Sequence, residues 1–459
     1  MENIIVNQYL EKKKPQRKGE FLTPPRILAL GFASLILIGA LLLTLPAATL
    51  NGQGLNFLDA LFTATSAVCV TGLVVVDTGT YFTTFGQVVI LLLIQVGGLG
   101  FMTFATLFAI ILGRKITLKE RLLLQEALNQ VSLEGIVRLA KYVIQISFVI
   151  EVLGALILTM RWSTDLGWGK ALYFGVFHAI SAFNNAGFDL FGNFSSLTRY
   201  QADIITNITI MLLIITGGIG FAVLSDAYVN RGRKFTLHSR AVLKVSGVLI
   251  LLGAFFIFAL EYTNPKTLGS LDPTAKVLAS FFQSVTPRTA GFNTLNLPDL
   301  RDTTVLIIIV LMFIGASPGS TGGGIKTTTL LAIILSVSST FKGYCHVTLE
   351  GRTLPKDIIQ KAVAMTFTAM LLVLTVTGLL TITEEADVLT LLFEVTSAFG
   401  TVGLSLGVTP NLSPLGRLAI IFTMFCGRVG PLTLAFALAQ KRTLVMNQIK
   451  YPEERIIIG

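Results

Sequence analysis

Long apolar stretches separated by short polar segments dominate the chain. Eight of them are long enough to cross the ~30 Å hydrocarbon core of a bilayer as helices. They cover approximately 26–46, 82–112, 140–160, 204–229, 241–261, 303–340, 362–381 and 415–440. The pattern predicts an all-α polytopic membrane protein with eight transmembrane helices. The sixth stretch is too long for one straight crossing, and a Gly-, Ser- and Thr-rich run from Gly315 to Lys326 interrupts it.

One segment occurs four times, each time between the two spans of a pair. A Phe precedes a Gly by ten residues in each copy: Phe62 and Gly72, Phe177 and Gly187, Phe281 and Gly291, and Phe393 and Gly403. Four residues after the Phe, three copies have Ser66, Ser181 or Ser397, and the third has Val285. The residues between form apolar helices too short to span a bilayer. The spacing predicts four fused span–pore-loop–span repeats, with four re-entrant pore helices around a central pore.

The charged residues indicate which side of the membrane each loop occupies. The chain is 53% hydrophobic and 13% charged, with a mean hydropathy of +0.76 and a net charge of +10. Lys and Arg concentrate in the N-terminal tail and in loops 114–141, 231–240 and 342–361. By the positive-inside rule both termini are cytoplasmic, and the repeated segments enter from outside. The charge therefore reflects orientation in the cell membrane rather than nucleic-acid binding.

Repeats and charged loops divide the chain into seven parts. These are a cytoplasmic N-terminal tail (1–25), repeat 1 (26–113), a cytoplasmic loop (114–137), repeat 2 (138–230), repeat 3 (231–340) with an intramembrane loop (315–326), repeat 4 (341–440) and a cytoplasmic C-terminal tail (441–459). Three scattered cysteines and three scattered histidines give neither a disulfide framework nor a zinc site. A membrane enzyme would need a nucleophile or metal cluster, and the sequence offers none.

The end of each repeated segment has the chemistry of a cation site. A short helix directs its partly negative C-terminal end inward, and the glycine allows backbone angles that point carbonyl oxygens at the centre. Inward carbonyls can replace the hydration shell of a monovalent cation. Glycines that only pack helices are the alternative, but four in register favour a filter. The predicted filter residues are Val70, Thr71, Gly72, Asn185, Ala186, Gly187, Thr289, Ala290, Gly291, Thr401, Val402 and Gly403.

The layer beneath the predicted filter differs among the repeats. Repeats 1 and 2 have Gly97-Gly98-Leu99-Gly100 and Gly217-Gly218-Ile219-Gly220, which indicate bending or packing beside a pore. Repeat 3 has the intramembrane loop, where Pro318 and the glycines break the helix. Its resemblance to a phosphate loop fails, because Ile325 precedes Lys326 where that motif needs Gly. The residues of this layer, to which the family resemblance described below assigns the role of a gate, are Gly315, Ser317, Pro318, Gly319, Ser320, Thr321, Gly322, Gly323, Gly324, Lys326 and Arg428.

Three charged residues lie at membrane depth in the other repeats. Arg428 of repeat 4 is predicted to stand beside the pore as an electrostatic barrier and an anchor for the loop, and a structural pair or helix cap is the alternative. Glu151 and Glu394 favour structural hydrogen bonds. The fourth pore helix carries Glu394 where the others are expected to carry Thr63, His178 and Phe282.

These motifs resemble the ion-conducting subunit of the Ktr/Trk/HKT superfamily of potassium transporters, most of all the bacterial Ktr type. The resemblance covers 26–440 and matches one filter glycine per repeat: Gly72, Gly187, Gly291 and Gly403. It implies potassium as the transported ion with no organic cofactor, a potassium preference because Gly72 is not Ser, and a gate formed by the intramembrane loop. It also implies a homodimer, with the C-terminal tail at its interface, docked on a cytosolic ring of nucleotide-binding (RCK-type) regulatory subunits.

Potassium uptake is therefore the leading hypothesis. A secondary transporter coupled to sodium or protons is the alternative from another class. Four parallel repeats and the lack of paired intramembrane carboxylates argue against it.

Overall fold

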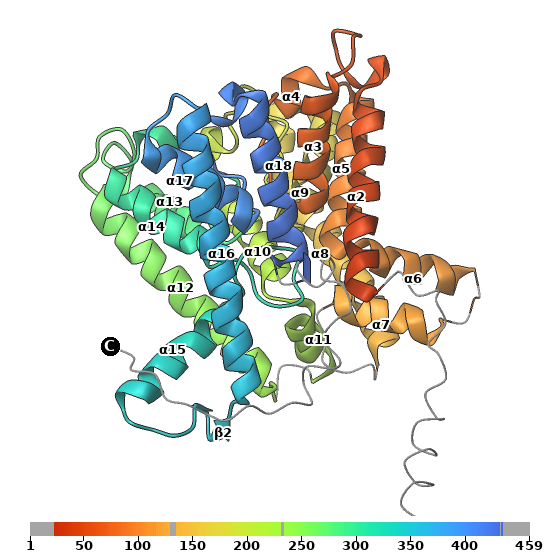
Figure 1. The fold of residues 1–459 in the computed structure, drawn as a ribbon. Coiled ribbons are helices and arrows are strands. Elements are labelled where there is room, and N and C mark those ends of the chain that lie inside the picture. The colour runs from red at the N-terminus through yellow and green to blue at the C-terminus, as the bar shows by residue number, and fades with distance from the viewer. Residues whose placement is uncertain are drawn as a thin grey trace, which may run out of the picture.

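A computed structural model describes residues 23–112, 114, 116–128, 135–230, 234–431 and 433–434. The predicted tails therefore fall outside the described residues, apart from positions 23–25. The described chain is mostly helical, with one short hairpin of β1 (Thr348–Leu349) and β2 (Arg352–Thr353). In Figure 1 the helices labelled α3, α9, α13 and α17 lie in the upper half of the view, and α11 (Phe221–Val229) and α15 (Thr327–Phe341) lie in the lower half.

Four helices among the described residues are long and apolar enough to cross a membrane alone. They are α2 (Pro24–Leu43), α8 (Ile136–Leu166), α12 (Leu237–Glu261) and α16 (Lys356–Thr383). A fifth span arises if α10 (Ile204–Gly218) and α11 (Phe221–Val229), which are bent by 96°, count as one. Each long helix has many large apolar side chains exposed, such as Phe148, Phe255 and Phe367. Such surfaces are stable in lipid rather than in water.

Each long helix packs against the short helix that follows it. The short helices are α3 (Phe57–Cys69), α9 (Trp168–Phe183), α13 (Pro273–Val285) and α17 (Val388–Gly400). A third helix completes each group: α5 (Thr84–Leu99), α10, α14 (Asp302–Phe313) and α18 (Pro414–Val429). Each third helix also contacts the next group's short helix, α5 with α9, α10 with α13, α14 with α17, and α18 with α3. The four groups therefore form a closed cycle.

The third helices break at glycines instead of running straight. We expected single helices over 82–112 and 204–229, and both expectations were wrong. The first is divided at Gly100, where φ is 82°, into α5 and α6 (Phe101–Ile111), and the second at Gly220, where φ is 100°. In the fourth group α18 ends before Gly430, where φ is 90°. Only glycine adopts these angles without strain, so the Gly-rich motifs act as helix breakers.

The same motifs also allow close helix packing. A Cβ atom on Gly97, Gly217 or Gly427 would collide with a carbonyl oxygen near the end of the short helix of the same group. Bending and close packing therefore both depend on these glycines, as small residues at membrane-helix interfaces generally permit.

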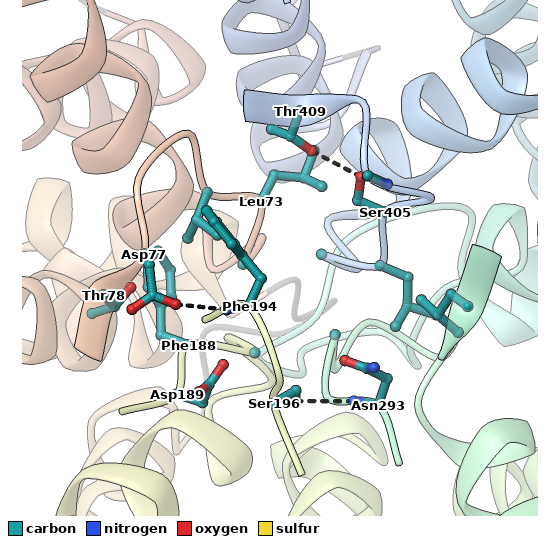
Figure 2. Close-up of a pocket in the computed structure, with 18 of the residues that line it drawn as sticks. Leu73, Asp77, Thr78, Phe188, Asp189, Phe194, Ser196, Asn293, Ser405 and Thr409 are labelled. Atoms are coloured by element: carbon teal, nitrogen blue, oxygen red, sulfur yellow. Dashed lines mark hydrogen bonds between the residues drawn. The ribbon is translucent and has the colours of Figure 1, made fainter. Parts of the chain in front are cut away.

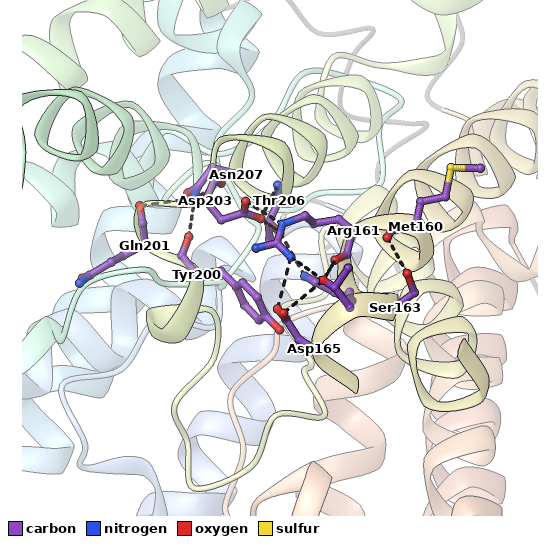
Figure 3. A network of polar contacts seen from close by, with 11 residues as sticks. Met160, Arg161, Ser163, Asp165, Tyr200, Gln201, Asp203, Thr206 and Asn207 are labelled. Carbon is purple, nitrogen blue, oxygen red and sulfur yellow. Dashed lines mark hydrogen bonds and ion pairs between the residues drawn. The ribbon is translucent and has the colours of Figure 1, made fainter. Parts of the chain in front are cut away.

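A polar network holds the end of α8 against α10 (Figure 3). Nε of Arg161 donates to Asp203 over 2.9 Å, and the indole of Trp162 donates to the Thr206 hydroxyl over 3.1 Å. Asp203 also caps α10 through the Thr206 amide over 3.1 Å. Trp162 is fully buried and lies edge-on to His178 of α9. The network thus fixes the short helix α9 between its two neighbours.

Candidate functional site

Each short helix ends in the same backbone turn. The residue two positions before each repeated glycine has a left-handed conformation, with φ of 58° at Val70, 60° at Asn185, 76° at Thr289 and 50° at Thr401. The glycines that follow also have positive φ, from 70° at Gly187 to 91° at Gly403. Non-glycine residues rarely adopt such angles and do so where the surrounding structure enforces them. The turn therefore recurs as strained local structure in all four copies.

The four turns meet in a closed ring. A Cβ atom on any repeated glycine would lie under 3.0 Å from a carbonyl oxygen of the next turn. The contacts are Gly72 with Ala186, Gly187 with Ala290, Gly291 with Val402, and Gly403 with Thr71. The structure therefore brings together the residues of all four predicted filter triplets. Glycine is required at these positions because backbone of the adjacent copy occupies the space of a side chain.

In the third copy, the offset from the buried phenylalanine to the repeated glycine is one residue shorter than we inferred. Counting from Phe281 predicted the same ten-residue offset, but Phe282 is the fully buried phenylalanine, and Phe281 is only partly buried. Likewise Thr286, not Val285, takes the place of the serine. Its hydroxyl donates to the Phe292 carbonyl over 2.5 Å, as that of Ser181 donates to Phe188 over 2.8 Å. The expected equivalence of Phe282 with Glu394 was therefore wrong, and Gln283 occupies that position.

An open cavity of about 360 Å³ lies on one side of the ring (Figure 2). All four repeated glycines line it, together with polar side chains that include Asn293, Ser405 and Thr409. Among the described residues, the acidic side chains Asp77 and Asp189 line it, and no Lys or Arg does. Asp77 is held by the amides of Thr80 (2.8 Å) and Phe194 (2.7 Å). A cavity with this lining attracts cations to the ring.

The Gly315–Lys326 loop lies against the other side of the ring. Its Gly323 amide donates to the Thr401 hydroxyl over 2.9 Å, and its Thr321 hydroxyl lies 3.3 Å from the Asn185 amide oxygen. A Cβ on Gly322 would collide with Thr289. The loop therefore contacts three of the four copies.

Neighbouring helices also hold the loop through its backbone. The amides of Ser317 and Thr321 donate to the carbonyls of Gly218 (3.0 Å) and Gly217 (3.3 Å), and the Gly319 carbonyl accepts from Phe221 over 2.7 Å. Within the loop, Ser320 bonds the Ser317 carbonyl over 2.6 Å, and Ser317 bonds Thr327 over 2.9 Å. The remaining predicted gate residues, Gly315, Pro318 and Gly324, complete the same compact loop.

Two cations anchor the loop. The Lys326 ammonium donates to the carbonyls of Gly322 (2.6 Å) and Gly323 (3.2 Å). The Arg428 guanidinium bonds the Thr321 carbonyl and the carbonyls of Gly97 and Gly98, the last over 2.9 Å. Arg428 thus joins groups 4 and 1 to the loop of group 3. No ion pair in the described part of the chain involves either residue.

A second cavity, of about 440 Å³, lies beyond the loop. Loop residues, Arg428 and the helix breaks at Gly100 and Gly430 line it. None of the repeated glycines lines this cavity, and no loop residue lines the first. The ring and the loop together therefore separate the two cavities.

The two acidic residues at membrane depth are hydrogen-bonded. Glu151 accepts from Gln95 over 3.0 Å and from Asn184 over 3.1 Å, which links α8 to α5 and α9. Glu394 is fully buried on α17 and accepts from the Thr409 hydroxyl.

The sequence placed Asn185 at the site but did not indicate what its side chain does. The side chain of Asn185 joins the copies, because its amide donates to the Arg288 carbonyl (3.3 Å) and to the Thr289 hydroxyl (3.1 Å). Asp189, two residues after a repeated glycine, was also missed. Its position in the repeat was the available signal, since residues just after the turn line the same cavity.

The chain is similar to known cation transport proteins over most of its length. The family model TrkH, described as "Cation transport protein", matches residues 10–444. The chain is 48% identical to Ktr system potassium uptake protein B of Bacillus subtilis over 438 residues, which cover 95% of this chain and 97% of that protein. It is 40% identical to the potassium/sodium uptake protein NtpJ of Enterococcus hirae, covering 97% and 99%.

A solved structure has the same fold. The potassium transporter TrkH from Vibrio parahaemolyticus superimposes with a TM-score of 0.73, covering 95% of this chain and 89% of that one. The sequence identity is 19%, so this likeness concerns the fold.

Proposed function

Because this chain belongs to the TrkH family of cation transport proteins, we propose that it takes potassium up across the cell membrane through the ring of Gly72, Gly187, Gly291 and Gly403. The observation that carries the proposal is the cyclic contact of each glycine with a carbonyl of the next copy. Carbonyl oxygens at such a ring replace water around a partly dehydrated monovalent cation. The names of two similar proteins, a potassium and a potassium/sodium uptake protein, agree with this ion class.

Ion flux in the purified protein tests the proposal. Liposomes that contain the full chain are expected to take up rubidium, with saturation and with inhibition by external potassium. Replacing Gly72 by Ser adds a side chain where the Ala186 carbonyl lies, and sodium is expected to compete better. Selectivity identical to that of the unmodified protein would contradict the assignment of the ring as the filter. Flux that requires a coupled counter-ion would favour a secondary transporter instead.

The Gly315–Lys326 loop is proposed as the gate. It contacts the ring through Thr321 and Gly323, and it lies between the two cavities. Its hydrogen bonds with Arg428 hold it in the closed position. Deletion of 317–324 is expected to raise rubidium flux, since nothing else in the proposed path replaces the loop. Unchanged flux after this deletion would contradict the gate.

The membrane arrangement and the partners belong to the same proposal. The second cavity faces the cytoplasm, both termini are cytoplasmic, and the twelve helices of the four groups form eight spans and four re-entrant pore helices. Two copies of the chain form a homodimer on a cytosolic ring of RCK-type nucleotide-binding subunits, which supplies nucleotide-dependent control of the gate. The similarity to proteins named as components of Ktr systems supports such partner subunits.

A further inference from the structure

One position on each short helix carries a buried polar side chain directly behind the ring. It lies nine residues before the repeated glycine in three copies and eight before it in the third. The residues are Thr63, His178, Gln283 and Glu394, and each is at most 1% exposed. Each directly follows the fully buried phenylalanine of its copy: Phe62, Phe177, Phe282 or Phe393. Buried polar side chains at such a position are costly unless they have hydrogen-bond partners.

In copies 2 and 4 the buried side chain reaches the segment that follows the glycine. Nδ1 of His178 donates to the Phe174 carbonyl over 2.7 Å, and Nε2 accepts from the Leu190 amide over 3.4 Å. Leu190 directly follows Asp189, which lines the first cavity. His178 therefore forms a hydrogen bond with the backbone of the cavity wall, on the side facing away from the cavity.

Glu394 makes the corresponding contact in copy 4. Its carboxyl group accepts from the Thr409 hydroxyl, which lies 3.0 Å from the Ser405 hydroxyl. Thr409 and Ser405 line the first cavity, and Figure 2 shows them side by side on its wall. Ser405 is two residues after Gly403. A buried carboxyl group thus holds the segment that leaves the ring.

The other two copies differ. Among the described residues, the Thr63 hydroxyl and both polar atoms of the Gln283 side chain have no hydrogen-bond partner. In the cyclic order of contacts, copies 2 and 4 are opposite each other, as are copies 1 and 3. At this position, hydrogen bonds from the short helix therefore reach the cavity wall in the opposite copies 2 and 4, but not in copies 1 and 3.

A contribution to folding stability alone does not explain why a glutamate is buried at position 394. The carboxyl group is fully buried, its second oxygen has no partner, and no ion pair in the described chain involves it. Breaking its hydrogen bonding with the Thr409 and Ser405 hydroxyls would release a segment next to Gly403. Buried polar groups of this kind are candidates for fixing geometry at a site.

We propose that Glu394, together with His178, is a positioning residue. The two side chains set the width of the outer mouth of the ring along one diagonal, and they thereby set its discrimination between potassium and the smaller sodium ion. This inference rests on the proposed function of the ring as a potassium filter. It assigns specificity to a layer behind the ring in addition to the backbone of the ring itself.

Competition by sodium against rubidium uptake in liposomes tests this inference. Replacing Glu394 by Leu removes the acceptor at similar volume, and sodium is expected to compete about tenfold better, the factor for one lost buried hydrogen bond. Replacing Glu394 by Gln keeps an acceptor for Thr409 and is expected to stay within about twofold of the unmodified protein. Replacing Thr409 by Val removes the donor instead and is expected to reproduce the Leu variant. This second variant remains informative if the Leu variant does not fold.

The matched control is Thr396→Val on the same helix, because Thr396 is buried and its hydroxyl makes no hydrogen bond. This variant is expected to keep the sodium-to-rubidium ratio. If Glu394→Leu and Thr409→Val lower total flux but keep that ratio, the role of Glu394 is only structural and the inference is wrong. If the unmodified protein shows no potassium-sensitive rubidium uptake, the proposed function itself fails.

Discussion

At the ring, four copies contribute the same backbone turn, whereas in the layer beneath it no group matches all the others. The turns ending in Gly72, Gly187, Gly291 and Gly403 share left-handed angles and a carbonyl contact with the next copy. Beneath them, groups 1 and 2 break at glycines, group 3 inserts a loop, and group 4 contributes Arg428. A cation in the centre requires similar ligands from every side, while a gate needs only one part that moves. We therefore propose that the repeated part recognises the ion and that the differing parts control its passage.

The largest effect on ion flux is expected from a substitution in one of the four equivalent turns. Gly291→Ala places a Cβ against the Val402 carbonyl at a φ of 81°. We expect rubidium flux to fall by about a hundredfold, because backbone strain and the collision both act at the ring. Gly167→Ala is the matched control, since φ there is 76° but nothing lies within 4 Å. Equal losses in both variants would mean that strain, rather than the ring contact, is responsible.

A smaller effect on ion flux is expected from a substitution in the layer beneath the ring, which differs among the four groups. Arg428→Gln removes the charge that holds the Thr321, Gly97 and Gly98 carbonyls. We expect rubidium flux to rise about fivefold without a change in selectivity, since loss of a charge-assisted bond favours the open loop. Arg352→Gln on β2, an exposed arginine that lines neither cavity, serves as control. A change of selectivity in Arg428→Gln would contradict the division of roles between the two layers.

Asp189, at the wall of the first cavity, tests whether the four copies differ in charge at the mouth of the ring although their backbone turns are alike. Burial raises the pKa of Asp189 to about 7, so its charge is fully present only well above that pH. At such a pH, Asp189→Asn is expected to raise the half-saturating potassium concentration about threefold at low ionic strength, because a negative charge near the ring is lost. The difference should vanish in high salt, which screens that charge. Asp302→Asn, at an exposed position that does not line the cavity, is the control. An increase that persists in high salt would indicate altered geometry instead.

The smallest expected effect concerns the caps of the short helices. The Asp387 side chain accepts from the Thr390 amide over 3.1 Å and caps α17, whereas Asp272 makes no such bond at α13. Asp387→Ala is expected to lower the free energy of unfolding by about 1 kcal/mol, and Asp272→Ala by less. Thermal unfolding in detergent measures both. Equal effects would show that charge near a helix start, not the cap, matters.

The same cap makes a small pH dependence predictable. Hydrogen bonds from the Thr390 side chain and amide lower the pKa of Asp387 below its ordinary value. A carboxyl group whose pKa is lower in the folded state stabilises the fold above the unfolded pKa of about 3.9. That contribution is lost as the pH falls through the lower, folded-state pKa. Asp387→Ala should therefore lose its difference from the unmodified protein in strong acid.

The parts that could be predicted from sequence are those that the chain repeats. Apolar length and the Phe–Gly spacing located the short helices and the glycines of the ring, and the Pro318 region identified the break in repeat 3. The helix breaks at Gly100 and Gly220 were missed, because apolar periodicity continues through them. Contacts such as Arg428 with Gly97 join residues more than 300 positions apart, and no local pattern encodes them. The single-residue deletion in the third copy was hidden because Phe281 and Phe282 are adjacent.

The contact of α18 with α3 has a consequence for how the protein is made. The Arg417–Asp59 ion pair joins the last group to the first across 358 positions of the chain. During synthesis, the first three groups enter the bilayer as an open arc, with the side of α3 that later meets α18 still uncovered. The ring closes only after α18 has been made and inserted, so closure follows insertion of the first three groups. Nascent chains that stop before Pro414 should therefore insert into the membrane but fail to close the ring.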